Sequence, residues 1–307
     1  MADLSAIWPE GAGRRLGLAV SGGPDSLALL LLAQEAMADR VAVASVDHGL
    51  RGESAAECAK VTRICADLGV AHAVLPVRVK PGNIQSEARA SRYAALAAWM
   101  AAEGLDALAT AHHADDQTET LLMRLNRGSG VAGLAGVRAR GTVPGSQAIV
   151  LRPLLGWRRT ELAQVVADAG LSPVQDSSNR DPRYDRVRLR SALAHVDWLD
   201  RAALARSAAH LADADEALEW AAQRELATVV WGTAGANWSG QVPRAVALRV
   251  MSAIIARLGG TEPRGGAVAA LCDRLAQGKT GTLCGVIVSP RKTGWRFDPE
   301  PARRTTS

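Results

Sequence analysis

Six consecutive residues early in the chain have the composition of an anion-binding loop: Ser21, Gly22, Gly23, Pro24, Asp25 and Ser26. Glycine lets the backbone approach a phosphate closely, serine hydroxyls donate hydrogen bonds, and the first turn of a helix presents unpaired N–H groups. Residues 16–20 form an apolar run typical of a buried strand, and residues 27–33 are rich in helix formers. This pattern predicts a phosphate-binding loop; the plainer alternative is an ordinary strand-to-helix turn with a capping side chain.

Asp25 adds a requirement to this predicted loop. A carboxylate beside a polyphosphate is repelled unless a cation lies between them, so Asp25 predicts a bound Mg²⁺. The loop lacks the lysine and the spacing of a Walker A loop, and it is not a G-x-G-x-x-G fingerprint. The residues therefore indicate a polyphosphate ligand with a metal ion, held by a loop of another kind.

A second dense group of ionisable residues lies in residues 110–120, where an apolar run gives way to a helical pattern. Asp116 and Glu119 are three residues apart, so they share one face of that helix near its first turn. Acidic residues there also complement the helix dipole. A metal site of His112, His113 and Asp116 is a further alternative. The density of the group favours a functional site.

Arginines are concentrated in two places. Arg89 and Arg92 are three apart in a predicted helix, where they either reach a phosphate or form a solvated surface. Five more lie within eleven residues: Arg180, Arg183, Arg186, Arg188 and Arg190. This stretch predicts contacts with nucleic-acid phosphates, and local ion pairs with neighbouring aspartates are the alternative.

The elements that must position these residues alternate along the chain. Strands are predicted at residues 16–20, 41–46, 71–77, 107–111 and 148–151, with helices between them and at residues 158–169. Such alternation predicts an α/β fold with a doubly wound, mostly parallel sheet, whose ligands lie beyond the carboxyl ends of the strands. The loop, Asp47 with His48, and His112 with His113 would meet at that edge.

The alternation stops near residue 171. A loop is expected over residues 173–190, followed by a long helix from about 197 to 231 and shorter helices at 244–258 and 266–276. Residues 282–288 and 294–297 are expected to form a hairpin that turns at Ser289 and Pro290. The end of the chain is therefore predicted to be a small, mainly helical C-terminal domain.

Composition narrows the class of protein. The 307 residues, 48% of them hydrophobic, suffice for one α/β domain and a smaller partner. The net charge of +5 suits a nucleic-acid partner but is weak evidence alone. The four cysteines contain no C-x-x-C pair, which predicts reduced thiols. We expect no secretory signal, no membrane span and a cytoplasmic location.

The motifs together resemble a known family. S-G-G-P-D-S is similar to the signature of PP-loop ATP pyrophosphatases, which cleave ATP to AMP and pyrophosphate while adenylating a substrate. Residues 110–120 and 124–134 narrow the resemblance to tRNA(Ile)-lysidine synthases. Residues 47–51, 87–93, 152–155 and 176–179 resemble further motifs of that family in the same order. One position departs from it: the family's R-N-R-I-R has Val187 here in place of asparagine.

The resemblance implies a PP-loop ATP-binding catalytic domain, similar to adenine nucleotide alpha hydrolases, over residues 1–195. Residues 196–307 would form a helical connector and a small tRNA-contacting domain. The implied enzyme is a carbon–nitrogen ligase. It would adenylate the wobble cytidine (position 34) of the isoleucine tRNA with a CAU anticodon, and join the ε-amine of free L-lysine to C2 of that base.

The resemblance also implies roles for the residues singled out above. Catalysis would use Asp25, Arg89, Arg92, Asp116 and Glu119. ATP would be held by Ser21, Gly22, Gly23, Pro24, Asp25, Ser26, Asp47, His48 and His112, with Mg²⁺ on Asp25. Lysine would be held by Asp116 and Glu119, because paired carboxylates can bind its ammonium and accept a proton. Contacts to tRNA would come from Arg180, Arg183, Arg186, Arg188 and Arg190.

Two other functions stay open at this stage. Another PP-loop enzyme, such as a tRNA thiolase or an amide-forming synthetase, is the first, although thiolation usually needs paired cysteines and no glutaminase domain is evident. A nucleotide-sensing RNA-binding protein with a degenerate loop is the second, although every position of the loop motif is filled. The sequence also leaves open whether the chain forms a homodimer.

Overall fold

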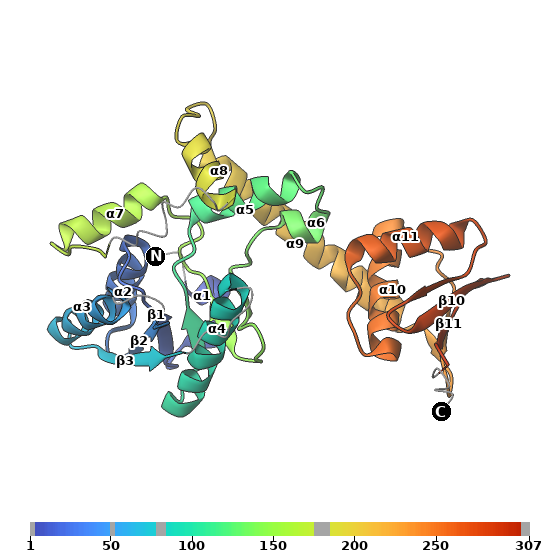
Figure 1. Ribbon diagram of the computed structural model, residues 1–307, viewed down its shortest axis with the longest axis horizontal. Helices are drawn as coiled ribbons and strands as arrows, with labels where there is room; N and C mark the ends of the chain where they lie inside the picture. Colours follow the sequence, from blue (N-terminus) through green and yellow to red (C-terminus); the bar gives the residue numbers. More distant parts are fainter. Residues whose placement is uncertain (1–3, 50–52, 78–83, 175–184, 302–307) are drawn as a thin grey trace. The chain divides into compact units, whose positions relative to one another are not determined.

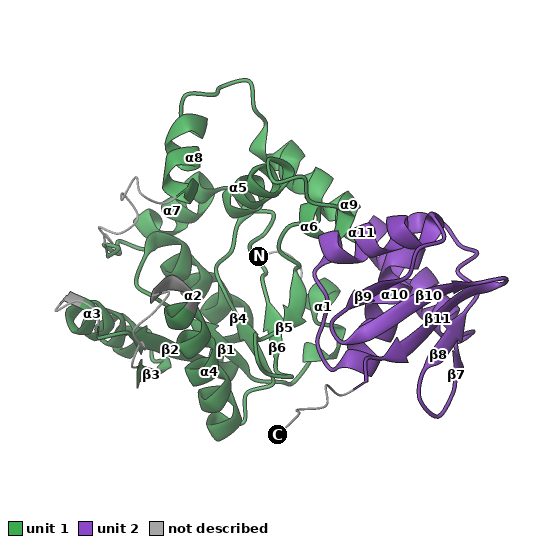
Figure 2. Cartoon of the chain, turned by 45° about the vertical axis from the view of Figure 1, so that its right-hand side comes forward, with its two compact units in different colours: residues 1–212 green, residues 213–307 purple. Residues whose placement is uncertain are grey.

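The computed structural model describes residues 4–49, 53–77, 84–174 and 185–301. Residues 176–179, Arg180 and Arg183, which the sequence analysis singled out, lie outside these ranges. The chain divides into two compact units, Met1–Ala212 and Asp213–Ser307 (Figure 2). The division falls within one long helix, α9 (Arg201–Leu226). The functional roles given to the two predicted domains stay predictions.

Six strands form one sheet in the described part of unit 1, in the order β3-β2-β1-β4-β6-β5 (Figure 1). Their bounds are β1 Leu16–Ala19, β2 Val41–Asp47, β3 Ala71–Pro76, β4 Ala107–Ala109, β5 Arg140–Thr142 and β6 Ile149–Leu151. All neighbours are parallel except β5, which is antiparallel to β6. The five parallel strands were predicted; β5 was not, because an exposed edge strand needs no apolar run.

Helices cover both faces of this sheet. On one face α2 (Pro24–Met37), α3 (Glu53–Asp67) and α7 (Arg159–Asp168) pack against side chains such as Val43. On the other, α4 (Ile84–Glu103) packs against the next residue of β2, Ala44, and against Leu108. Successive strand residues thus enter opposite cores, as a sheet buried on both sides requires. The doubly wound α/β fold class is confirmed.

The remaining elements of unit 1 are shorter or lie beyond the sheet. They are α1 (Leu4–Ile7), η1 (Pro9–Gly11), η2 (Ala38–Arg40), α5 (Ala114–Leu125), α6 (Val131–Leu134) and α8 (Asp185–Leu193). Helix α8 corrects the expectation of a loop that extends to Arg190. Asp185 in its first turn and Arg190 in its last both complement the helix dipole, which favours a helix over these residues.

Unit 2 combines helices with a second sheet. Besides the end of α9 it contains α10 (Arg244–Gly259) and α11 (Gly265–Ala276). In its described residues, β7 (Val230–Trp231), β8 (Ala236–Trp238), β9 (Gly281–Leu283), β10 (Val286–Arg291) and β11 (Gly294–Pro299) form an antiparallel sheet in the order β7-β8-β11-β10-β9. Val250, Ile254 and Phe297 are fully buried between the helices and the sheet. Of this sheet only the last hairpin was predicted, and its first predicted strand, residues 282–288, is divided by a turn into β9 and β10.

Two predicted boundaries in unit 2 are corrected. Helix α9 ends at Leu226, five residues before Trp231, because the β-branched run from Thr228 to Val230 favours the strand that follows. The last hairpin does not turn at Pro290, which pairs with Trp295 inside it. The turn lies after Arg291 and uses Gly294, where a Cβ atom would lie 2.1 Å from a backbone oxygen.

Two general features of the chain bear on its class. Across the described ranges, no helix combines the length and the apolar character needed to cross a membrane. All four cysteines fall within those ranges and are free thiols.

Candidate active site

The predicted anion-binding loop joins β1 to α2 and is shaped by its own hydrogen bonds. The Ser26 hydroxyl accepts a hydrogen bond from the Ser21 N–H at 3.2 Å and donates one to the Gly23 carbonyl at 3.0 Å. Gly22 has a φ of +84°, and a Cβ atom there would lie 2.9 Å from a methyl group of Val174. Only glycine fits this position without strain. Pro24 begins α2, so the unpaired N–H groups of a helix terminus lie next to the loop.

A cleft of about 560 Å³ opens at the carboxyl ends of β1, β2 and β4. Pockets for small molecules usually measure roughly 300–1,000 Å³. The predicted ATP-binding residues that line it are Ser21, Gly23, Pro24, Asp25, Ser26, His48 and His112. Gly22 shapes the loop without lining the cleft.

Asp47 also stays outside the lining of the cleft. Its carboxylate accepts hydrogen bonds from the Ser54 hydroxyl at 2.6 Å and from the Gly49 N–H at 2.9 Å. These bonds lower the pKa of Asp47. The carboxylate therefore holds the turn after β2 and the start of α3, next to the cleft.

Three arginines with no carboxylate partner among the described residues line the cleft. Arg89 and Arg92 of α4 line it, and their guanidinium carbons lie 5.1 Å and 5.9 Å from the ring centre of buried Tyr93. Arg159 of α7 lines it too. Among the described residues none of the three side chains has a carboxylate partner. These cations are therefore available to a polyanionic ligand.

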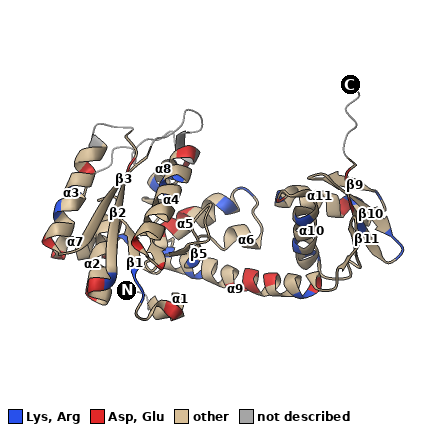
Figure 3. Ribbon diagram, turned by 90° about the horizontal axis from the view of Figure 1, so that it is seen from below, with Lys and Arg blue, Asp and Glu red and all other residues tan. Residues whose placement is uncertain are grey.

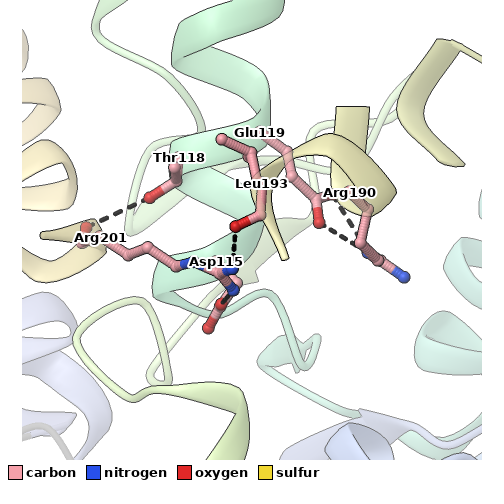
Figure 4. A pocket seen from close by; sticks show the side chains of 6 residues that line it. All are labelled: Asp115, Thr118, Glu119, Arg190, Leu193 and Arg201. Atoms are coloured by element: carbon pink, nitrogen blue, oxygen red, sulfur yellow. Dashed lines mark hydrogen bonds and ion pairs between the residues drawn. The ribbon is translucent and has the colours of Figure 1, made fainter. Parts of the chain in front are cut away.

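The two carboxylates of α5 are held by arginines of α8. Arg186 contacts Glu119 at 2.5 Å and Asp116 at 2.6 Å, and Arg190 contacts Glu119 at 2.7 Å. Figure 4 shows Arg190 directed at the Glu119 carboxylate. Glu119 is only 3% exposed. Burial alone would raise its pKa, but the two guanidinium groups hold that pKa below its usual value.

Asp116 and Glu119 differ in their access to ligands. Asp116 lines the cleft, whereas Glu119 lies behind it and lines a separate small cavity. A ligand in the cleft can therefore reach Asp116 directly.

His113 lies among three carboxylates at the start of α5. Its Nε2 is 3.5 Å from Asp25 and 3.5 Å from Asp116, and its Nδ1 is 3.6 Å from Asp115. Burial lowers the pKa of His113, but these carboxylates outweigh burial and raise the pKa to about 9. The side chain is therefore cationic at neutral pH, and it connects the loop to α5.

His112, the preceding residue, has the opposite charge state. Burial and the surrounding arginines lower its pKa to about 3, so the imidazole is neutral. Its Nδ1 lies 2.9 Å from the Thr110 hydroxyl, and the residue lines the cleft. A neutral imidazole fixed in this way can exchange a hydrogen bond with a ligand without adding charge.

The charges that contact one another around the start of α5 balance. Four carboxylates (Asp25, Asp115, Asp116 and Glu119) contact four cations (His113, Arg186, Arg190 and Arg201). No group of three or more His, Cys, Asp or Glu side chains within the described ranges could hold a metal ion. The acidic residues therefore form an ion-pair network, not the metal site that His112, His113 and Asp116 offered as an alternative.

Comparisons with known proteins agree with this geometry. The family model described as a PP-loop domain matches residues 2–196. A tRNA(Ile)-lysidine synthase of Novosphingobium aromaticivorans is 49% identical over 308 residues, which cover 99% of this chain and 94% of that protein. The chain belongs to the tRNA(Ile)-lysidine synthase family. A second tRNA(Ile)-lysidine synthase, from Zymomonas mobilis subsp. mobilis, is 40% identical over 94% of this chain and 90% of its own length.

A solved structure supports the fold alone. The U34-tRNA thiolase NcsA of Methanococcus maripaludis, which carries a [4Fe-4S] cluster, superposes with a TM-score of 0.51. It is 17% identical and covers 64% of this chain and 71% of its own. The resemblance to tRNA(Ile)-lysidine synthases stated from the motifs is thus confirmed by the relatives, and the PP-loop fold by the family model.

The arginines predicted to contact tRNA have different surroundings within this family member. Arg186 and Arg190 are occupied by the carboxylates of α5, and both line the cleft. Arg188 pairs with Asp185 on the same helix, and Figure 3 shows both charge signs on α8. Val187, the departure from the family motif, lines the cleft. Contact with tRNA stays a prediction.

Sequence reasoning missed two members of the network, Asp115 and Arg201. Asp115 accepts a hydrogen bond from the Arg159 N–H at 3.0 Å and forms an ion pair with Arg201. Asp115 stands beside Asp116, so its position in the motif offered a signal. Arg201 offered none, because it is 86 residues away from its partner.

Proposed function

We propose that this chain joins the ε-amine of free L-lysine to C2 of the wobble cytidine of the CAU-anticodon isoleucine tRNA, at the expense of ATP. The observation that carries the proposal is the composition of one cleft. It is lined by the predicted anion-binding loop, by arginines of α4 and α7 and by the Asp116 carboxylate. These are the groups needed for a polyphosphate, for developing negative charge and for an ammonium.

The first step would activate the base. The C2 oxygen of the cytidine attacks the α-phosphorus of ATP, the bond to the β-phosphate bridging oxygen breaks, and pyrophosphate leaves. Negative charge develops on the departing pyrophosphate and is stabilised by fixed donors. The Ser21 hydroxyl and the start of α2 supply donors on one side, and Arg89 and Arg92 supply cations on the other. His112 supplies a neutral polar contact within the same cleft.

Asp25 is the residue that would hold Mg²⁺. Its Oδ1 is buried and has no hydrogen-bond partner in the described part of the chain. A single carboxylate is sufficient, since Mg²⁺ commonly completes its coordination with substrate phosphates and water. The residues therefore fit the ion, which would neutralise phosphate charge.

The second step would use lysine as the nucleophile. Its ammonium has a pKa near ~10.4 and must lose a proton before the amine attacks C2 and AMP leaves. Asp116 reaches the cleft and can bind the ammonium and accept that proton. Glu119 would act with Asp116 through Arg186, the cation that both carboxylates share.

The tRNA would bind with its anticodon loop at the cleft, where an unpaired base can be turned into the pocket without melting a duplex. Arg188 projects from α8 and is 64% exposed at its side chain, so it is accessible to a phosphate. Because ATP and tRNA are cytoplasmic, we place the reaction in the cytoplasm.

The proposal is tested by incubating the purified chain with ATP, Mg²⁺, radiolabelled lysine and the isoleucine tRNA transcript. Label in the tRNA and one pyrophosphate released for each lysine incorporated are expected. A transcript with uridine at position 34 and the Asp25→Asn variant serve as controls. ATP binding without pyrophosphate release would support a nucleotide sensor, and pyrophosphate release without lysine transfer would support another PP-loop enzyme.

A further inference from the structure

Arg201, the first residue of α9, contacts two other helices next to the α5 carboxylates (Figure 4). Its guanidinium forms an ion pair with Asp115 of α5 and donates a hydrogen bond to the Leu193 carbonyl, at the end of α8, at 3.2 Å. Its own carbonyl accepts a hydrogen bond from the Thr118 hydroxyl at 3.2 Å. One residue thus joins α5, α8 and α9.

These contacts are enclosed. Asp115 and Thr118 are buried, and a cavity of about 10 Å³, space for a single water, lies between them and Arg201. Glu119 and Arg190 line the same cavity. The contacts of Arg201 therefore lie directly behind the pairs that join α5 to α8.

We propose that Arg201 is a positioning residue, which fixes the α5 carboxylates against the α8 arginines and thereby sets the affinity for lysine. The proposal rests on the assignment of Asp116 to lysine made above. The ion pairs between α5 and α8 in the described part of the chain involve Asp116 and Glu119 themselves, which an arriving ammonium must disturb. Arg201 keeps the two helices together while that happens, because its own partners are Asp115 and two backbone or hydroxyl groups.

The position of Arg201 in the chain adds to this role. Helix α9 runs without interruption for 26 residues and crosses the division between the two units. Ala222, near its other end, is buried in the core of unit 2. Arg201 is thus the point at which the helix leading to unit 2 is attached to the helix that carries Asp116.

The test compares Arg201→Ala and Arg201→Lys with Arg206→Ala, an exposed position on the same helix. Two quantities are measured: the lysine concentration for half-maximal transfer, and pyrophosphate release with tRNA and ATP but without lysine. For Arg201→Ala we expect the first to rise about tenfold, equivalent to about 1.4 kcal/mol, and the second to change less than about twofold. Arg201→Lys should rescue part of the effect, since a lysine can pair with Asp115 but lacks the fork that also reaches Leu193. Arg206→Ala should leave both quantities unchanged.

If Arg201→Ala has the wild-type lysine requirement, the proposal is overturned. It is also overturned if lysine transfer and lysine-free pyrophosphate release are impaired by the same factor, because that indicates a general structural role. If Arg201→Ala does not fold, Thr118→Val decides, because it removes only the hydroxyl, which donates to the Arg201 carbonyl and, within α5, to the Ala114 carbonyl. It should raise the lysine requirement in the same selective way, and an unchanged requirement overturns the proposal.

Amide hydrogen exchange separates this proposal from the proposed function. Arg201→Ala or Thr118→Val should speed exchange in α5 and leave β1 and β4 unchanged. If the wild-type chain transfers no lysine, the proposed function fails, whereas faster exchange in α5 still supports the attachment by Arg201. Unchanged exchange in α5 overturns that attachment.

Discussion

Replacing Glu119 by glutamine removes the charge that holds α5 to α8. The Glu119 carboxylate accepts hydrogen bonds from Arg186 Nε at 2.5 Å, from Arg190 Nε at 2.7 Å and from Arg190 Nη2 at 3.1 Å. Removing one partner of a fully buried ion pair costs about 3–5 kcal/mol. Arg186 and Arg190 are 44% and 32% exposed at their side chains, so water would solvate part of the charge left behind. We therefore expect Glu119→Gln to lower the free energy of unfolding by about 2 kcal/mol.

The same contacts predict how this difference changes with pH. The folded-state pKa of Glu119 lies below its ordinary value of 4.5, chiefly because the two arginines outweigh burial. A depressed pKa contributes stability that is complete above the unfolded-state value and is lost as the pH falls through the folded-state value. The difference in stability between wild type and Glu119→Gln should thus be constant near neutral pH and shrink below about pH 4.5.

Urea unfolding at pH 7 and at a series of acidic pH values measures both effects. Glu216→Gln is a matched control, because Glu216 is an exposed helical glutamate. It should change the unfolding free energy by less than about 0.5 kcal/mol. If Glu119→Gln lowers the unfolding free energy at pH 7 by no more than the control does, the ion pairs on which the lysine assignment depends are refuted. A loss of stability that does not change with pH refutes them as well.

Three further predictions concern the substrates. Gly22→Ala places a side chain at a φ of +84° and 2.9 Å from Val174, so it should lower the free energy of unfolding by about 1–2 kcal/mol. It should also raise the half-saturating ATP concentration for pyrophosphate release, and an unchanged ATP requirement contradicts this. Asp116→Asn should raise the apparent KM for lysine about tenfold, because the amide cannot pair with an ammonium, while tRNA adenylation persists. An unchanged lysine KM would exclude the assignment. Replacing Arg186 and Arg188 together by alanine should weaken tRNA binding and reduce the slope of log K against log salt by about one to two. A slope equal to that of wild type would show that neither arginine meets a phosphate.

The sheet of unit 1 could be predicted because its strands are buried on both faces. A parallel strand such as β2 then appears in the sequence as an unbroken apolar run. β5, β7 and β8 could not be found in this way, since each has two or three residues of which at least one is exposed, whereas β4 and β6, with three residues each, are apolar throughout and have no exposed residue. The turn of the last hairpin was misplaced because Pro290 is a frequent turn residue, yet a strand tolerates it where its missing N–H is not needed.

The location of the site could be predicted, but not its charge states. Loops at the carboxyl ends of parallel strands must meet at one edge, and this rule places Ser26 beside His112 from order in the chain alone. His112 and His113 are adjacent and identical in type, yet one is neutral and the other cationic. Burial lowers the pKa of both, and arginines from other helices and strands lower that of His112 further. For His113 the nearby Asp115 and Asp116, together with the remote Asp25, outweigh burial, and neither the arginines nor Asp25 could be placed from the local sequence.

Arg186 shows how the structure sharpens the proposed order of the two steps. Its guanidinium pairs with Asp116, the carboxylate assigned to lysine, and the charges of the ion-pair network to which both belong are already balanced. A lysine ammonium adds one positive charge to this balance, which is unfavourable in a partly buried site unless an anion arrives as well. The reaction supplies such anions when ATP and the phosphates of tRNA enter the cleft, and they can draw Arg186 away from Asp116. The electrostatics of the cleft thus favour adenylation of the base before lysine is bound, the order in which the chemistry needs its substrates.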